Sequence, residues 1–118
     1  MVQAAAAYAV TLVARTQKEV VVRVAGSELR FNLLHTLPFD SARRRMSVVV
    51  REPKSGHILL LCKGADCSVL PRARAAVNNQ GEDLLEATVA QIAEYSSTGL
   101  RSLVMAARKV DEMEYCQW

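Results

Sequence analysis

The chain has 118 residues, 51% of them hydrophobic and 23% charged, which is the size of one domain with a real core. Only 5% are aromatic and the net charge is +3, so the core must be mostly Val, Leu and Ala, and a general nucleic-acid coat is not expected. No apolar run approaches the ~18–20 residues of a membrane-spanning helix. The N-terminal alanine run lacks the basic region and cleavage site of a signal peptide.

The first elements are expected to be a helix followed by a strand. Residues 2–14 consist largely of good helix formers, with apolar residues four positions apart, and predict a helix. The β-branched run over 18–24 predicts a strand, and Ala25-Gly26-Ser27 predicts a turn after it.

Residues 29–37 predict a second strand, because apolar and polar side chains partly alternate there. Leu29, Phe31 and Leu33 would share one face. Pro38 is expected to end the strand, because proline has no N–H group to donate to the ladder.

Two further strands are predicted over 46–51 and 57–63, joined by a turn at 53–56. Both runs are continuously apolar, which is typical of central strands that are covered on both faces.

The last part of the chain predicts a loop, a helix, a strand and a short helix. Residues 71–82 are polar and predict a loop with some helical character. The helix over 84–95 would place Leu85, Val89 and Ile92 on one face and end at Gly99, a plausible left-handed residue. Residues 100–110 predict a strand, after which Asp111 would cap a final helix.

Because the links between the predicted strands are short, the pairing should be mainly antiparallel. The expected fold is therefore α/β in the loose (α+β) sense, an antiparallel β-sheet flanked by helices, in a single domain over 1–118.

The three cysteines, Cys62, Cys67 and Cys116, have no tight pair spacing, and the two histidines add no metal-like spacing. This is a poor disulfide framework and a poor zinc site. We expect three reduced thiols, as in a cytosolic protein.

Neither G-x-x-x-x-G-K-[ST] nor G-x-G-x-x-G occurs in the chain. A nucleotide would therefore have to be held by side chains rather than by a glycine-rich cradle of backbone amides.

The segment 38–52 places Phe39 and three arginines before a predicted strand. Strand alternation would put Arg43 and Arg45 on one face, pairing with acids such as Asp66 or Glu52, and Arg44 on the other. The arginines are read either as a solvated edge or as part of an anion site. Phe39 is read either as a core ring or as a ring that offers its face to a planar base.

Two further cationic positions follow other elements. Lys63 ends an apolar strand, where it either snorkels to water or lies at the rim of a pocket, and Gly64 permits a close approach by backbone or ligand. Arg101 follows the helix, where it is either a salt-bridge partner or a third cation that binds phosphates.

These motifs together resemble those of a known family. F-D-S-x-R-x-R-M-S-V (39–48), K-G-A-D (63–66) and G-L-R-S-L (99–103), in this order and context, are similar to the nucleotide-binding (N) domain of P-type ATPases, in the lipid-flippase (phospholipid-transporting) branch. The start of the chain resembles the helix that follows the S-P-D-E-A-A-L segment of flippases. The closing E-x-x-Y-x-x-W resembles the family's last short helix.

The resemblance implies a set of ATP-binding residues. Phe39 would stack on adenine, with Ser41 at the pocket edge and Arg44 at a position where the family usually has lysine. Lys63 and Gly64 would line the pocket floor, and Arg101 and Ser102 would contact phosphates or ribose. Arginine and lysine are not interchangeable, so the contact made by Arg44 is left open.

The resemblance also implies the role of a larger parent protein. The parent would be a phospholipid-transporting P-type ATPase, a translocase coupled to ATP hydrolysis, and this domain would position Mg-ATP for an aspartate elsewhere. D-K-T-G-T, the hinge aspartates and the S-P-D-E acid are absent, so the chain is expected to be a truncated, soluble and non-catalytic domain. It would lie on the cytosolic face of a membrane.

The partners implied by the resemblance are ATP, the phosphorylation, actuator and transmembrane domains, and an accessory subunit. Two alternatives stay open at this point. One is a nucleic-acid-binding module that uses Arg43–Arg45, and the other is a structural domain that no longer binds nucleotide.

Overall fold

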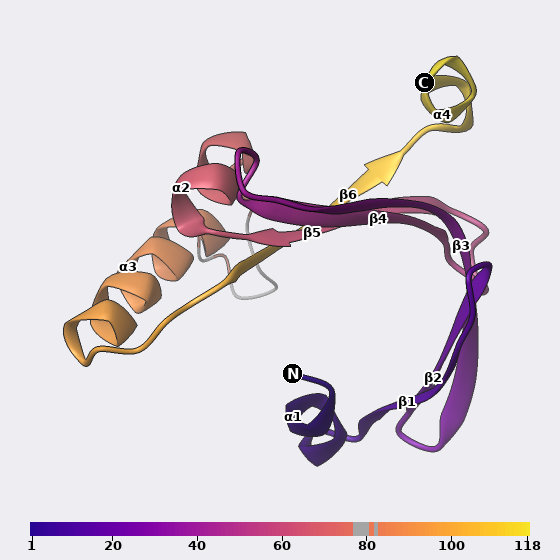
Figure 1. Ribbon diagram of the computed structural model, residues 1–118, viewed down its shortest axis with the longest axis horizontal. Helices are drawn as coiled ribbons and strands as arrows, with labels where there is room; N and C mark the ends of the chain where they lie inside the picture. The colour runs from indigo at the N-terminus through magenta and orange to yellow at the C-terminus, as the bar shows by residue number, and fades with distance from the viewer. Residues whose placement is uncertain (77–80, 82) are drawn as a thin grey trace. The chain divides into compact units, whose positions relative to one another are not determined.

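The computed structural model describes residues 1–76, 81 and 83–118. In this part of the chain six strands form one antiparallel sheet in the order β1-β2-β3-β4-β5-β6, with flanking helices, as the sequence predicted (Figure 1). The elements are α1 (Val2–Ala7), β1 (Val10–Arg15), β2 (Glu19–Val24), β3 (Ser27–Asp40), β4 (Arg45–Arg51), β5 (Ile58–Gly64), α2 (Asp66–Val69), the 3-10 helix η1 (Leu70–Arg72), α3 (Leu84–Ser97), β6 (Val104–Val110) and α4 (Glu112–Gln117).

The chain divides into two compact units. The first comprises Met1–Leu37, Ser47–Leu61 and Ala107–Trp118, and the second comprises Pro38–Met46 and Cys62–Ala106. All seven predicted site residues fall in the second unit.

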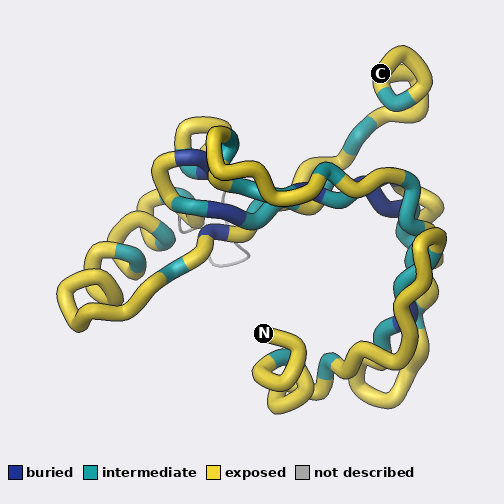
Figure 2. The backbone as a smooth tube through the Cα atoms, in the orientation of Figure 1, coloured by how far each residue is buried: buried dark blue, intermediate teal, exposed yellow. Residues whose placement is uncertain are grey.

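The core of each unit is small, as the few buried positions in Figure 2 show. Among the described residues, the buried apolar side chains of the first unit are Val21, Val49, Val50 and Ile58, and those of the second are Val69 and Val104. The buried apolar residues are thus valines and one isoleucine. The prediction of valine is confirmed, whereas the expected leucine and alanine are not among the buried residues in the described part of the chain.

The predicted helix over 2–14 is wrong in its second half. The alanines form α1, but Ala9 adopts a left-handed conformation at φ +60°, and β1 begins at Val10. Val10, Thr11 and Val13 are β-branched, and Val10 to Arg15 pair antiparallel with β2. Pairing with a strongly β-prone neighbour therefore outweighs helix propensity here.

The strand over 18–24 and the turn after it are confirmed as β2 and the β2–β3 hairpin. Val24 pairs with Ser27, and the two turn residues Ala25 and Gly26 have φ of +47° and +86°. A two-residue loop with both residues left-handed matches the right-handed twist of the strands, as in type I′ hairpins.

The strand predicted over 29–37 is confirmed, but Pro38 does not end it, because β3 continues to Asp40. β2 pairs with β3 from Ser27 to Asn32, so Pro38 lies in the part of β3 beyond that pairing.

The strands β4 and β5 and the turn between them are confirmed. Glu52 N–H donates to His57 O over 2.9 Å, which closes the hairpin. Adjacent Val49 and Val50 are both buried, so both faces of β4 are covered at that point. Leu61 on β5 is exposed, so the expected cover on both faces does not extend along the whole of β5.

The predicted helix over 84–95 is confirmed as α3, and its end is as expected. Asp83 caps its start by accepting from Leu85 N–H and Glu86 N–H. Gly99 has φ +79°, and the N–H groups of Gly99 and Leu100 donate to Ser96 O and Tyr95 O, a Schellman motif.

Two details of this region differ from prediction. Val89 is exposed, while Leu85, Thr88 and Ile92 are half-buried, so the inward stripe includes Thr88 instead of Val89. The strand expected from residue 100 begins only at Val104, because residues 100–103 first lead the chain away from the end of α3. The predicted loop at 71–82 begins within η1, and its residues 77–80 and 82 lie outside the described residues.

The final helix is confirmed as α4, and Asp111 occupies its N-cap position, but the Asp111 side chain makes no capping hydrogen bond. Contacts within the first unit hold α4 instead. Arg51 on β4 forms an ion pair with Glu112, and His35 Nε2 lies 3.1 Å from Tyr115 Oη.

Candidate nucleotide-binding site

Residues 41–44 form a tight turn between β3 and β4, and Asp40 shapes it. Asp40 Oδ1 accepts from Ala42 N–H over 2.6 Å and from Arg43 N–H over 3.2 Å, while Asp40 O accepts from Arg44 N–H over 2.7 Å. The backbone N–H groups of Arg43 and Ala42 lower the pKa of Asp40 from its usual value. The turn is therefore built around a charged aspartate.

The turn overturns the expectation that strand alternation directs the three arginines. Arg43 and Arg44 precede β4, and Arg44 has a left-handed φ of +52°. The side chain of an aspartate competes with strand pairing by offering its own acceptor to the next backbone N–H groups. The direction of Arg44 is therefore set by the turn and not by a pleat.

The expected pairing of Arg43 and Arg45 with Asp66 or Glu52 is also wrong. Arg45 Nη1 donates to Arg43 O over 3.1 Å and to Ser68 Oγ over 3.0 Å. Glu52 instead accepts from Ser55, which lowers the pKa of Glu52. Arg45 is thus a structural tie between the turn and α2.

Gly64 lies against the backbone of this turn. A Cβ atom on Gly64 would come within 2.5 Å of both Arg44 O and Arg45 Cβ, closer than real Cβ atoms approach other atoms. The following N–H, that of Ala65, donates to Arg44 O over 3.0 Å. The predicted close approach at Gly64 is therefore made by the protein's own backbone.

The strand register places Phe39 and Lys63 on one face. Asp40 and Arg45 flank the turn, so Phe39 lies opposite Met46. The Glu52–His57 hydrogen bond and the Arg45–Gly64 contact set Met46 opposite Lys63. Directly opposed residues in antiparallel strands project to the same face. Phe39, Met46 and Lys63 therefore form one row across β3, β4 and β5, with Arg45 and Gly64 on the other face.

The exposure of Phe39 excludes one of its two interpretations. The Phe39 side chain is 66% exposed, so it is not a core ring. Lys63 is half-buried in the same row, and Ser41 and Arg44 are exposed in the adjoining turn. The structure thus gathers an exposed ring, a lysine and a cationic turn at one end of three neighbouring strands.

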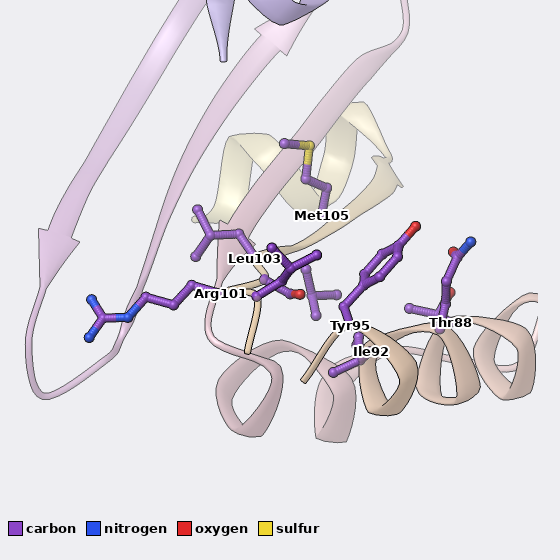
Figure 3. Close-up of a pocket in the computed structure, with 10 residues that line it drawn as sticks. Thr88, Ile92, Tyr95, Arg101, Leu103 and Met105 are labelled. Carbon is purple, nitrogen blue, oxygen red and sulfur yellow. The ribbon is translucent and has the colours of Figure 1, made fainter. Parts of the chain in front are cut away.

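Arg101 and Ser102 lie in a different part of the second unit, at a shallow pocket of about 440 Å³ beside α3. Thr88, Ile92 and Tyr95 from α3 and Leu103 and Met105 from the following segment also line it (Figure 3). The Arg101 guanidinium points away from Tyr95 and Thr88 in that view. Among the described residues, no hydrogen bond or pocket joins this group to Phe39, Lys63 and Arg44.

A comparison with known families identifies the family of the chain. The family described as "P-type ATPase, cytoplasmic domain N" matches residues 7–117. The chain belongs to this family. Its position within the P-type ATPases is indicated by relatives that carry the name phospholipid-transporting ATPase.

Three of these relatives come from two animals and a plant. Phospholipid-transporting ATPase VD of Mus musculus is 40% identical over 124 residues, covering 100% of this chain and 9% of that protein. Phospholipid-transporting ATPase ID of Homo sapiens is 38% identical over 118 residues, covering 100% of this chain and 9% of that protein. Phospholipid-transporting ATPase 2 of Arabidopsis thaliana is 43% identical over 98 residues, covering 82% of this chain and 8% of that protein. The chain thus spans less than a tenth of the length of these relatives.

Within this P-type ATPase N domain, the described residues contain no cluster of three or more potential metal ligands. No helix in the described ranges is long and apolar enough to cross a membrane. All three cysteines are free, with Cys67 and Cys116 exposed.

Ser68 is the residue near the site that sequence reasoning missed. It is 7% exposed, and its Oγ donates to Arg43 O over 2.6 Å while accepting from Arg45 Nη1. It lies two residues beyond K-G-A-D and belongs to no motif. No signal in the sequence singles it out.

Proposed function

We propose that this N domain binds ATP on the row formed by Phe39, Met46 and Lys63 and on the adjoining turn. The observation that carries the proposal is the exposed ring of Phe39 at the end of β3, beside the 41–44 turn. From the ends of β3 and β4 and the contacts between β4 and β5 we infer that Lys63 shares its face. An aromatic face and nearby cations are the groups that bind a base and its phosphates when no glycine-rich loop is available.

Each predicted residue has a role in this proposal. Phe39 stacks on adenine, and Lys63 lies along the pocket floor, whose backbone is kept close-packed by Gly64. Ser41 lies at the pocket edge. The Arg44 guanidinium is flat and permanently charged, so it suits either a phosphate or the rim of the base.

Arg101 and Ser102 would contact phosphates or ribose. Arg101 supports this role because its guanidinium points away from the apolar lining of the α3 pocket (Figure 3). The candidate residues are cations, hydroxyls and a ring, which suit a nucleotide and not a divalent cation. We therefore propose that Mg²⁺ is used with the nucleotide phosphates and is not held by this domain.

On the scale of the parent protein, we propose a phospholipid-transporting P-type ATPase that couples lipid translocation to ATP hydrolysis. This domain would present ATP at the cytosolic face of a membrane to an aspartate in a phosphorylation domain. Actuator and transmembrane domains, and an accessory subunit, would be its other partners. Phosphoryl transfer depends mainly on positioning and charge, and positioning is the task assigned here.

Phe39→Ala tests the proposal. We expect ATP to bind the unsubstituted 118-residue chain, called the parent chain below, with an affinity of roughly −4 to −6 kcal/mol, in the high micromolar to millimolar range. Loss of the ring should weaken this by about 1–3 kcal/mol, because stacking is lost. The measurement is an ATP titration followed by backbone amide shifts, in which Phe39, Lys63 and Arg101 should respond.

Two variants control for nonspecific effects. Phe39→Tyr keeps the ring and should keep most of the affinity. Tyr8→Ala removes a more exposed ring, that of the C-cap residue of α1, and should leave ATP binding unchanged. Unchanged ATP binding by Phe39→Ala would remove the basis of the proposal. A parallel titration with a short RNA distinguishes the nucleic-acid alternative, which requires salt-sensitive shifts at Arg43–Arg45 with RNA and none with ATP.

A further inference from the structure

Residues outside the recognised motifs determine the shape of the turn that carries Ser41 and Arg44. Asp40 fixes the N–H groups of the turn, but the turn also presents carbonyl groups that need donors. Arg44 has φ +52°, a conformation that non-glycine residues hold only when the surroundings enforce it. Contacts from outside the hairpin are therefore relevant to how Arg43 and Arg44 are held.

The segment that follows K-G-A-D supplies these donors. Ala65 N–H donates to Arg44 O over 3.0 Å, and Ser68 Oγ donates to Arg43 O over 2.6 Å. Two consecutive carbonyl groups of the turn are thus bonded to two positions of one short segment. Such a pair of bonds fixes the two peptide groups on either side of the Arg44 Cα atom. It therefore fixes the direction in which the Arg44 side chain leaves the turn.

Ser68 and Arg45 form a closed ring of hydrogen bonds with Arg43 O. Arg45 Nη1 donates both to Ser68 Oγ and to Arg43 O, and Ser68 Oγ donates to the same carbonyl oxygen. Ser68 is 7% exposed, so water cannot readily replace its hydroxyl. Removing the hydroxyl would leave Arg43 O and the Arg45 guanidinium short of a buried partner.

We propose that Ser68 and Arg45 are positioning residues for the nucleotide site. They act through the turn, by holding Ser41 and Arg44 at the end of the row formed by Phe39, Met46 and Lys63, and they do not touch the nucleotide. Arg45 projects to the face opposite Phe39 and Lys63, in agreement with an indirect role. This inference rests on the proposed ATP binding and adds the two residues that prepare the site.

The test compares Ser68→Ala with the parent chain by ATP titration and by denaturant unfolding. We expect about tenfold weaker ATP binding, since one net buried hydrogen bond is worth about that factor. The amide resonances of Ala42, Arg43 and Arg44 should already shift in the nucleotide-free variant. Ser68→Thr keeps the hydroxyl and should restore most of the affinity.

Ser47→Ala is the matched control, because Ser47 is a serine of equal burial, 6% exposed, on β4. The unfolding midpoints of Ser47→Ala and Ser68→Ala are compared directly. Ser47→Ala should keep the ATP affinity of the parent chain. If Ser68→Ala does not fold, Arg45→Met decides, because it removes the other donor and keeps the aliphatic stem. The Ser68→Ala, Arg45→Met double variant should bind ATP no more weakly than the weaker single variant, since both remove the same ring.

The outcomes separate the two proposals. If the parent chain binds ATP and the Ser68 and Arg45 variants bind it equally well, the positioning role is wrong and ATP binding stands. If the parent chain shows no ATP-dependent shifts at Phe39 or Lys63, the proposed function fails and the positioning role fails with it.

Discussion

At the scale of single residues, Gly64 has the least tolerance for change in the site. A methyl group there would meet Arg44 O and Arg45 Cβ, both at 2.5 Å, and neither belongs to the far end of a flexible side chain. We expect Gly64→Ala to lower the free energy of unfolding by about 1–3 kcal/mol, as overpacking does. Chemical denaturation measures this loss, and ATP titration should show weaker binding because the turn is displaced.

Gly56→Ala is the control for this prediction. Gly56 has φ +72° but open space around its Cβ position, so its substitution costs only backbone strain, about 1 kcal/mol. Gly56→Ala should therefore destabilise the chain less and keep ATP affinity. A Gly64→Ala variant as stable as the parent chain would show that β4 and β5 are less closely apposed than the structure indicates.

The pH response of the turn follows from Asp40. Its pKa is lowered by the backbone N–H groups of Arg43 and Ala42, so the folded state favours the charged form. The contribution of Asp40 is therefore present above its usual pKa of about 3.9 and is lost as the pH falls through the lowered value. The amide resonances of Ala42 and Arg43 should move in that acidic range.

Asp40→Asn provides the comparison. The amide keeps an oxygen acceptor but cannot titrate, so the acid-induced movement of Ala42 and Arg43 should disappear. If the movement persists in Asp40→Asn, another acidic group controls the turn.

The individual residues of the site were predictable in different degrees. Phe39 and Lys63 were singled out by their motifs, but the row that they share depends on the register between strands, which the sequence does not show. The direction of Arg44 was not predictable from the alternation of side chains along a strand, because the Asp40 side chain accepts hydrogen bonds from the backbone and forms a turn there. Ser68 was not predictable at all, since its role depends on a tertiary approach between two segments 25 positions apart.

At the scale of elements, α4 is held to the first unit by an ion pair and by aromatic packing of Tyr115 and Trp118 on His35. Arg51 pairs with Glu112 through two hydrogen bonds, and this pairing raises the pKa of Arg51 and lowers that of Glu112. The pair is largely exposed, so salt should screen it. Its contribution is present at neutral pH and is lost as the pH falls through the lowered pKa of Glu112.

Glu112→Gln tests this contact. We expect a small fall in the thermal midpoint at low ionic strength and little difference from the parent chain at high salt, as for exposed ion pairs. Lys54→Gln removes a charge from an exposed turn of the same unit and should change neither. A salt-independent loss for Glu112→Gln would mean that packing, and not charge, holds the helix.

Elements with strong local signals were predictable, and those decided by neighbours were not. Gly99 ends α3 as expected, because its left-handed conformation is a local property. β1 was mistaken for helix because its partner β2, and not its own composition, determines its conformation. The course of β3 beyond Pro38 was also not predicted, because proline was expected to end the strand.

At the scale of the whole molecule, the antiparallel sheet was predictable because hairpin-length links leave few other topologies. The division into two compact units was not, because it cuts across β3, β4, β5 and β6 within single strands. Each unit has a small buried core, so each depends on backbone pairing and turns as much as on apolar burial. For this reason we expect single substitutions at Ser68 or Gly64, near the 41–44 turn, to have a large effect on ATP affinity and stability.

The irregularity in β1 has a consequence for self-association. β1 lies at an edge of the sheet, and its register with β2 shifts between Leu12 and Ala14, leaving Val13 as an extra residue. Leu12 and Val13 are both exposed there. A bulge bends an edge and interrupts its row of free N–H and C=O groups, which discourages a second molecule from adding a strand. Deleting Val13 would straighten this edge strand and make it a template for aggregation.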